Sequence, residues 1–202
     1  MKLYYAPGAC SLSPHIVALE LGLPLDLVQV DIRQGKLADG SDFSAINSKG
    51  YVPVLEFDDG RRLTEGPAIV QYLADRKPEA GLAPPAGSLE RYRLQEWLNF
   101  ITSEIHKQFS PLFNPALPDD WKQAAHDALA RRFDWLSTQL TGKSYLMGEN
   151  FTVADAYLFT VLNWSPSTGI DLAHWPVLQD YVARMAARPK VREALQAEGL
   201  LQ

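Results

Sequence analysis

The first 76 residues alternate between short runs with the pattern of strands and longer stretches with the pattern of helices. The strand-like runs are at residues 2–5, 27–30, 52–57 and 62–64. The Asp59–Gly60 pair separates the last two runs and is a hairpin signal. Helical stretches at residues 13–21 and 67–76 carry proline near their starts. This order predicts a β-α-β unit followed by a β-β-α unit, forming a four-stranded mixed sheet covered by helices.

The pattern after residue 88 is helical. Apolar residues recur there at helical spacing: Leu94, Trp97, Leu98, Ile101 and Ile105, then Leu129, Phe133, Leu136 and Leu140. Such stripes predict helix faces buried in a core. The stretch after Thr152 is apolar nearly all round, so we expect its helix to lie inside the domain. Thr152 and Asp155 have the spacing of a helix cap and its third-position partner.

A short segment separates the two patterns. Residues 79–88 are rich in Pro, Gly and Ala and poor in bulky apolar side chains, which is typical of a linker. We therefore expect a mixed α/β domain at residues 1–78 and an all-α domain at residues 89–202.

The overall composition excludes several classes of protein. The formal net charge is −5, and no run of Lys and Arg creates a basic surface, so nucleic acid is not an expected partner. No apolar segment approaches the roughly 18 residues of a membrane span, and the Pro7–Gly8 pair interrupts any signal-peptide core. One cysteine allows no internal disulfide. These features predict a soluble cytoplasmic protein with a reduced thiol.

The single cysteine lies at a position where a thiolate would be stabilised. Cys10 falls on the loop between the first strand and the first helix, where backbone N–H groups and the helix dipole favour an anion. The sequence Cys10-Ser11-Leu12-Ser13 has the spacing of a thioredoxin-type motif with a hydroxyl in place of the second thiol. Such a thiol could form a mixed disulfide but could not resolve it internally. A small buried side chain without chemistry is the alternative.

Two further stretches could bind an extended peptide with an amino-acid head group. Val52 precedes Pro53, and a cis bond there would leave its N–H and C=O available for backbone pairing. Glu65 and Gly66 lie at a predicted helix start, where a backbone N–H can donate to a carboxylate and Glu65 can accept from an ammonium group. The alternatives are an ordinary trans proline and a capped helix with a solvated acid.

A polar stripe follows the linker. Asn99, Ser103 and His106 fall at i, i+4 and i+7, which places them on one face of an α-helix. This face could line a binding cleft, and the alternative is a solvated helix face with a surface histidine. The other three histidines have no partners at ligand spacing: His15, His126 and His174. We therefore expect no metal site.

Several of these stretches together resemble one family. They are YYAPGACSLSPHIVALELG, NSKGYVPVLEFDDG, LTEGPAIVQYLAD, EWLNFITSEIHKQFSPLF and FTVADAYLFTVL. The chain is similar to the cytosolic glutathione transferases, specifically the bacterial beta class, over essentially its whole length. The resemblance implies a thioredoxin-like N-terminal domain, an all-helical C-terminal domain and a homodimer.

The resemblance also implies roles for single residues. Val52 would pair with the cysteinyl part of glutathione beside a cis Pro53, and Glu65 and Gly66 would hold the γ-glutamyl end. Cys10 would lie beside the glutathione sulfur, whereas Tyr5 would be a packed bystander. The family's lysine for the glycine carboxylate falls one position before Lys36, which is the candidate here. On the helix after the linker, the implied glutathione contacts are Asn99, Ser103, Glu104 and His106, some reaching across the dimer.

The implied function is a bacterial detoxification enzyme that conjugates glutathione to small hydrophobic electrophiles. Glutathione is a co-substrate, and no other cofactor is expected. A thiol with a pKa near 8.5 is mostly protonated at neutral pH, so conjugation requires groups that lower this pKa. The helix terminus, Cys10 and His106 are the candidates. Two alternatives stay open: glutathione-dependent disulfide exchange through Cys10, and a non-catalytic glutathione or hydrophobic-ligand binding protein.

Overall fold

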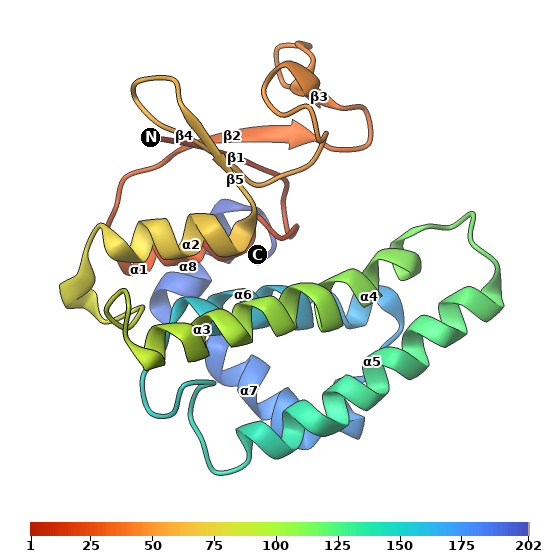
Figure 1. The fold of residues 1–202 in the computed structure, drawn as a ribbon. Helices are drawn as coiled ribbons and strands as arrows, with labels where there is room; N and C mark the ends of the chain where they lie inside the picture. The colour runs from red at the N-terminus through yellow and green to blue at the C-terminus, as the bar shows by residue number, and fades with distance from the viewer. Residues whose placement is uncertain (202) are drawn as a thin grey trace. The chain divides into compact units, whose positions relative to one another are not determined.

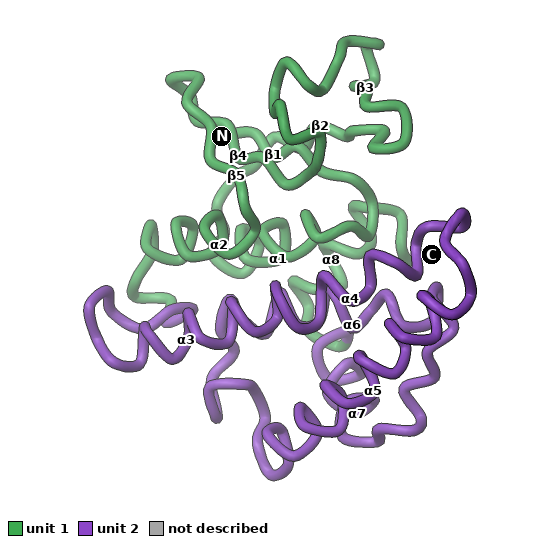
Figure 2. Tube along the Cα trace, turned by 45° about the vertical axis from the view of Figure 1, so that its right-hand side comes forward, with its two compact units in different colours: residues 1–80, 187–202 green, residues 81–186 purple. Residues whose placement is uncertain are grey.

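The structure is a computed structural model that describes residues 1–201 (Figure 1). The chain divides into two compact units (Figure 2). Unit 1 consists of Met1–Ala80 and Ala187–Gln202, and unit 2 of Gly81–Ala186. The expected linker at residues 79–88 spans the first of these boundaries. The helical domain was expected to extend to residue 202, whereas residues 187–202 are grouped with unit 1.

Unit 1 contains a mixed sheet. Its strands are β1 (Lys2–Tyr5), β2 (Asp26–Asp31), β3 (Lys36–Leu37), β4 (Val54–Glu56) and β5 (Arg62–Thr64). They lie in the order β3-β2-β1-β4-β5, with β1 and β2 parallel and every other pair antiparallel. The expected count of four strands was wrong by one. Since β3 has only two residues, it lacks the alternating pattern that marks a strand, and backbone pairing with Val30 and Asp31 defines it.

Three helices pack within unit 1. They are α1 (Leu12–Glu20), α2 (Gly66–Asp75) and α8 (Pro189–Ala197), and Figure 1 shows them together along one side of the sheet. Short 3-10 turns lie at Phe43–Ala45 (η1) and Pro78–Ala80 (η2). Helices α1 and α2 begin one residue earlier than the sequence pattern suggested.

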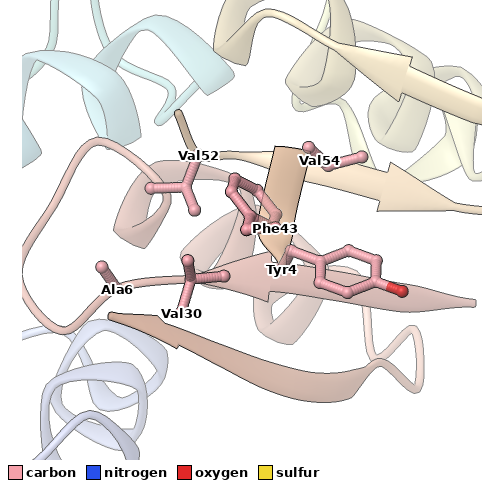
Figure 3. Close-up of a cluster of buried hydrophobic side chains, with 6 residues drawn as sticks. All are labelled: Tyr4, Ala6, Val30, Phe43, Val52 and Val54. Carbon is pink, nitrogen blue, oxygen red and sulfur yellow. The ribbon is translucent and has the colours of Figure 1, made fainter. Parts of the chain in front are cut away.

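The sheet separates two sets of buried side chains. Tyr4 of β1 is paired in register with Val54 of β4, and both belong to a cluster of buried apolar residues. Figure 3 shows this cluster, whose members are Tyr4, Ala6, Val30, Phe43, Val52 and Val54. Leu3 and Leu55, the neighbours in each strand, are fully buried and point to the opposite face. The cluster includes Val52 and therefore fixes a segment predicted to bind ligand.

Unit 2 is helical. Its longer helices are α3 (Leu89–Phe100), α5 (Asp119–Leu140), α6 (Val153–Leu162) and α7 (Pro176–Ala186). A π-helix, Ile101–His106 (η3), continues α3 and leads into the single turn α4 (Lys107–Phe109). Three 3-10 turns complete the unit: Ser110–Phe113 (η4), Pro166–Thr168 (η5) and Leu172–His174 (η6). Every residue of α6 is buried, which confirms the helix expected inside the domain.

The start of α6 is fixed by a buried carboxylate. The backbone N–H and the hydroxyl of Thr152 both donate to Asp155 Oδ2 at 2.8 Å, which confirms the predicted cap. The Leu146 N–H and the Tyr181 hydroxyl donate to Oδ1 at 2.8 and 3.0 Å. Burial raises the pKa of Asp155, and these four hydrogen bonds oppose that shift. Asp155 thus joins α6, α7 and the preceding loop.

Candidate functional site

The loop that carries Cys10 runs from β1 to α1. Fully buried Ser11 fixes it, because the Ala6 N–H donates to Ser11 Oγ at 3.1 Å and the Ser11 hydroxyl donates to the Ala6 carbonyl at 3.2 Å. The Ser13 N–H and hydroxyl donate to the Cys10 carbonyl at 3.3 and 3.1 Å. Cys10 is half-buried, two residues before the first residue of α1. It therefore lies at the N-terminal end of a helix, where the dipole stabilises negative charge.

The side chain of Cys10 reaches the segment that precedes β4. Its thiol donates to the backbone carbonyl of Val52, with an Sγ–O distance of 3.3 Å. The Val52–Pro53 peptide bond is cis, which confirms the isomer implied by the resemblance. Two predicted site residues that are 42 positions apart therefore contact each other.

A buried carboxylate from the end of the chain supports the same loop. Glu198 is 5% exposed, and its Oε2 accepts a hydrogen bond from the Gly8 N–H at 2.9 Å. Its Oε1 lies 2.9 Å from Nδ1 of buried His15 on α1. Burial raises the pKa of Tyr5, and the nearby Glu198 charge adds a smaller shift in the same direction. No partner for His15 was expected from the sequence, because no local pattern relates it to a residue 183 positions away.

Glu65 lies directly before α2 and already binds an ammonium group. Lys49 Nζ donates to Glu65 Oε1 and, at 2.8 Å, to Thr64 Oγ1. The Tyr51 hydroxyl donates to the same Glu65 oxygen at 3.3 Å. Glu65 has φ of 69°, a left-handed conformation that is uncommon for a residue with a side chain. Sequence reasoning missed Lys49, although it lies three residues before Val52 in a stretch the resemblance included.

Lys36 is placed on a short edge strand of the sheet. It is exposed, pairs through its backbone with Asp31 of β2 and forms an isolated bridge with Asp42. Hydrogen bonds from Ser44 lower the pKa of Asp42, and the Lys36 charge adds to this shift. The preceding Gly35 has φ of 65°, a conformation that a lysine there would adopt at a cost.

The predicted polar stripe of unit 2 is interrupted by the π-helix. Asn99 and Ser103 are exposed, and the Ser103 hydroxyl donates to the Asn99 carbonyl at 3.1 Å. Glu104 is paired with Arg132 of α5, with Nε–Oε2 at 2.8 Å. A π-helix has i→i+5 bonds, so a face worked out at α-helical spacing does not extend through it. The expectation of a single stripe through His106 was therefore wrong.

His106 instead contacts the core of unit 2. Its Nδ1 lies 2.7 Å from the hydroxyl of Tyr157 on α6, and its ring lies 4.9 Å from that of Trp164. Burial, with a smaller effect of the Lys107 charge, lowers the pKa of His106 to about 4. The alternative of a surface histidine was wrong. At neutral pH this side chain is an uncharged imidazole whose Nδ1 is engaged, and its Nε2 is the nitrogen left for a ligand.

Two kinds of feature are absent from residues 1–201, the part of the chain that the structure describes. No group of three or more His, Cys, Asp or Glu side chains is arranged to hold a metal ion in this part of the chain. Over the same residues, no helix has the length and apolar character needed to cross a membrane.

Comparison with known proteins decides the family. The glutathione S-transferase N-terminal domain matches residues 8–76, and the glutathione S-transferase C-terminal domain matches residues 100–189. Glutathione S-transferase GstA from Escherichia coli O157:H7 is 46% identical over 200 residues, covering 99% of this chain and 100% of that protein. The chain belongs to the glutathione S-transferase family. This confirms the family recognised in the sequence.

Two solved structures of glutathione S-transferases are similar to this chain over its whole length. A bacterial beta class glutathione S-transferase from Sphingomonas chungbukensis is 48% identical with a TM-score of 0.96, each chain being fully covered. A sphingomonad glutathione S-transferase complexed with glutathione is 47% identical with a TM-score of 0.95 and the same coverage. The fold of the transferase is thus thioredoxin-like at its N-terminus and helical at its C-terminus. These relatives support glutathione conjugation and do not support the two alternatives, disulfide exchange and non-catalytic binding.

Proposed function

We propose that this transferase joins the sulfur of glutathione to small apolar electrophiles at a site built on Cys10, Val52, Pro53, Glu65 and Gly66. The observation that carries the proposal is the contact between the Cys10 thiol and the Val52 carbonyl. An extended peptide that paired with the Val52 backbone would bring its own cysteinyl group beside Cys10. The relative complexed with glutathione supports the choice of tripeptide.

The reaction requires a glutathione thiolate, and the residues near Cys10 supply stabilisation for it. An ordinary thiol is only a few per cent ionised at neutral pH, and lowering its pKa by about two units makes most of it nucleophilic. Positive potential at the start of α1 stabilises the thiolate, and the Cys10 S–H is a donor within the same loop. The thiolate then attacks an electrophilic carbon and forms the C–S bond, while the leaving group departs with the electron pair.

The helical unit contributes a second set of contacts in this proposal. Asn99, Ser103, Glu104 and His106 bind glutathione, some of them from the partner of a homodimer. The neutral state of His106 supports a role as hydrogen-bond donor, because a neutral imidazole keeps one N–H. Lys36 is proposed for the glycine carboxylate, which its exposed position permits.

The electrophile is proposed to be flat and apolar. Phe109, Phe113 and Trp164 form an aromatic group in unit 2, with each phenylalanine ring centroid 5.6 Å from that of Trp164. Phe113 is half exposed, so part of this group is available to a ligand. We further propose that the transferase acts in the cytoplasm and needs no cofactor besides glutathione as co-substrate.

The test compares wild type with Cys10→Ser in two assays, conjugation of a chromogenic aryl halide and glutathione-dependent disulfide reduction. We expect disulfide exchange to disappear in Cys10→Ser and conjugation to persist at a reduced rate, because a serine hydroxyl still donates a hydrogen bond. Loss of both activities together would show that Cys10 is the reacting centre rather than a helper. Retention of wild type on immobilised glutathione without turnover would contradict the proposed reaction.

A further inference from the structure

Lys49 is a charged residue to which the proposed function gives no role. Its ammonium binds the Glu65 carboxylate and the Thr64 hydroxyl, and it lies 5.7 Å from the centroid of the Tyr51 ring. The Glu65 hydrogen bond raises the pKa of Lys49, so the ammonium stays protonated at neutral pH. A cation and an anion therefore lie side by side at the start of α2.

This ion pair is exposed and can open. The side chains of Lys49 and Glu65 are 42% and 54% exposed, and pairs of that kind add little to protein stability. If the ion pair opens and each side chain binds an opposite charge of a ligand, neither charge is left unpaired. An α-amino-acid head group can bind in this way, because it carries one ammonium and one carboxylate a few ångströms apart.

The surroundings have room for such a head group. Gly66 is the first residue of α2, and the first N–H groups of a helix have no partner within it. Apart from its chain neighbours and the backbone of its own helix, a Cβ added at Gly66 would meet no described atom within 4 Å, so the backbone there is approachable. An N–H group at this helix start and the Lys49 ammonium can therefore donate to one carboxylate.

We propose that Lys49 is a specificity-determining residue that binds the α-carboxylate of the γ-glutamyl head group while Glu65 binds its ammonium. The inference rests on the proposed function and extends it by one residue. In the free protein Lys49 and Glu65 neutralise each other. In the complex the zwitterion of the ligand lies between them, and each charge keeps an opposite partner.

The opposite role makes a different prediction. If Lys49 only occupied Glu65 and had to leave, removing its charge would tighten binding. If Lys49 binds the carboxylate, removing its charge weakens binding, and only for ligands that have this carboxylate. Lys49→Met separates the two roles because methionine keeps much of the stem and lacks the ammonium.

The experiment is calorimetry of the full chain with two ligands. S-methylglutathione has no free thiol and so avoids chemistry at Cys10, and its analogue with 4-aminobutyryl in place of γ-glutamyl lacks only the α-carboxylate. For Lys49→Met we expect S-methylglutathione to bind roughly 3- to 10-fold more weakly, in the range for an accessible charged hydrogen bond. Binding of the analogue should change less than twofold, and Lys49→Arg should recover most of the lost affinity.

Lys190→Met is the matched control. Lys190 is 46% exposed on α8 and is paired with Glu193. The Lys190→Met variant should bind both ligands as wild type does. Equal or tighter binding of S-methylglutathione by Lys49→Met overturns the inference, as does an equal loss for both ligands. If wild type itself gives no heat, the proposed function fails and this inference fails with it. A normal thermal unfolding curve for Lys49→Met excludes misfolding as the cause of weaker binding.

Discussion

Cys10 and Val52 are joined by a hydrogen bond from the thiol to the backbone carbonyl, at 3.3 Å. The residues come from the loop before α1 and the segment before β4, and each is fixed by buried neighbours, Ser11 in one case and the cluster of Figure 3 in the other. The carbonyl that a bound peptide would use is therefore the one that the thiol uses in its absence. A ligand there must cover the only cysteine of the chain.

This relationship predicts that S-methylglutathione protects Cys10 from alkylation. At a ligand concentration ten times its Kd, about one molecule in eleven is free, so the rate of reaction with iodoacetamide should fall about tenfold. Mass spectrometry of the intact chain measures the rate without ambiguity, because there is one thiol. Triglycine, which lacks the γ-glutamyl head group, is the control and should leave the rate unchanged. An undiminished rate with saturating S-methylglutathione would mean that the tripeptide binds elsewhere.

The structural features that the sequence predicted correctly are those whose signals lie within a few neighbouring residues. Helix α6 was identified with its cap because Thr152 and Asp155 are three residues apart and the apolar run follows directly. Strand β3 was missed because a two-residue strand carries no periodicity. The cis bond at Pro53 came from the resemblance, since the residue types alone also fit a trans proline.

The site shows the same limit. Cys10 and Glu65 could be identified from their positions at helix starts, and the structure places both there. The Glu198 carboxylate could not be found, because its partners, Gly8 on the Cys10 loop and His15 on α1, are separated from it by nearly the whole chain. His106 was assigned to the wrong helix face, because no residue type in the sequence indicates the π-helix in which it lies.

The Glu198 carboxylate should matter for stability as much as for the shape of the loop. Glu198→Ala removes the carboxylate that accepts from the Gly8 N–H and that pairs with the buried His15 ring, so we expect a loss of about 2–3 kcal/mol in the free energy of unfolding by urea. Glu193→Ala, on the exposed face of α8, is the control and should cost about 0.5 kcal/mol or less. Equal effects of the two substitutions would refute the role assigned to Glu198.

The depressed pKa of His106 predicts how stability depends on pH. In the unfolded chain this ring titrates near 6.5, and in the folded protein its pKa is about 4. Between these values the unfolded state binds more protons, so the contribution of His106 to stability is present above pH 6.5 and is lost as the pH falls towards 4. Burial is the cause, and the loss should approach about 3 kcal/mol, because each pH unit between the two pKa values is worth about 1.4 kcal/mol.

The measurement compares the free energies of unfolding of wild type and His106→Gln at pH 7.5 and pH 4.5. Glutamine does not titrate, so the variant should lose about 2.5 kcal/mol less than wild type on acidification, while all other groups contribute equally to both. Parallel losses in the two proteins would show that His106 titrates normally in the folded state.

Tyr157 should determine which nitrogen of His106 carries the proton. Its hydroxyl lies 2.7 Å from Nδ1. The Thr102 hydroxyl donates to the Leu98 carbonyl at 2.8 Å and to the Tyr157 oxygen at 3.4 Å. A phenol is a better donor than a neutral imidazole, so Tyr157 donates to Nδ1 and the ring N–H is on Nε2. Two-bond ¹H–¹⁵N correlation spectra should show this tautomer in wild type and a mixture in Tyr157→Phe, with Tyr181→Phe as a control that keeps the wild-type pattern. Conjugation by Tyr157→Phe should slow because Nε2 then carries its donor proton only part of the time, and an unchanged tautomer in Tyr157→Phe would show that another group orients the ring.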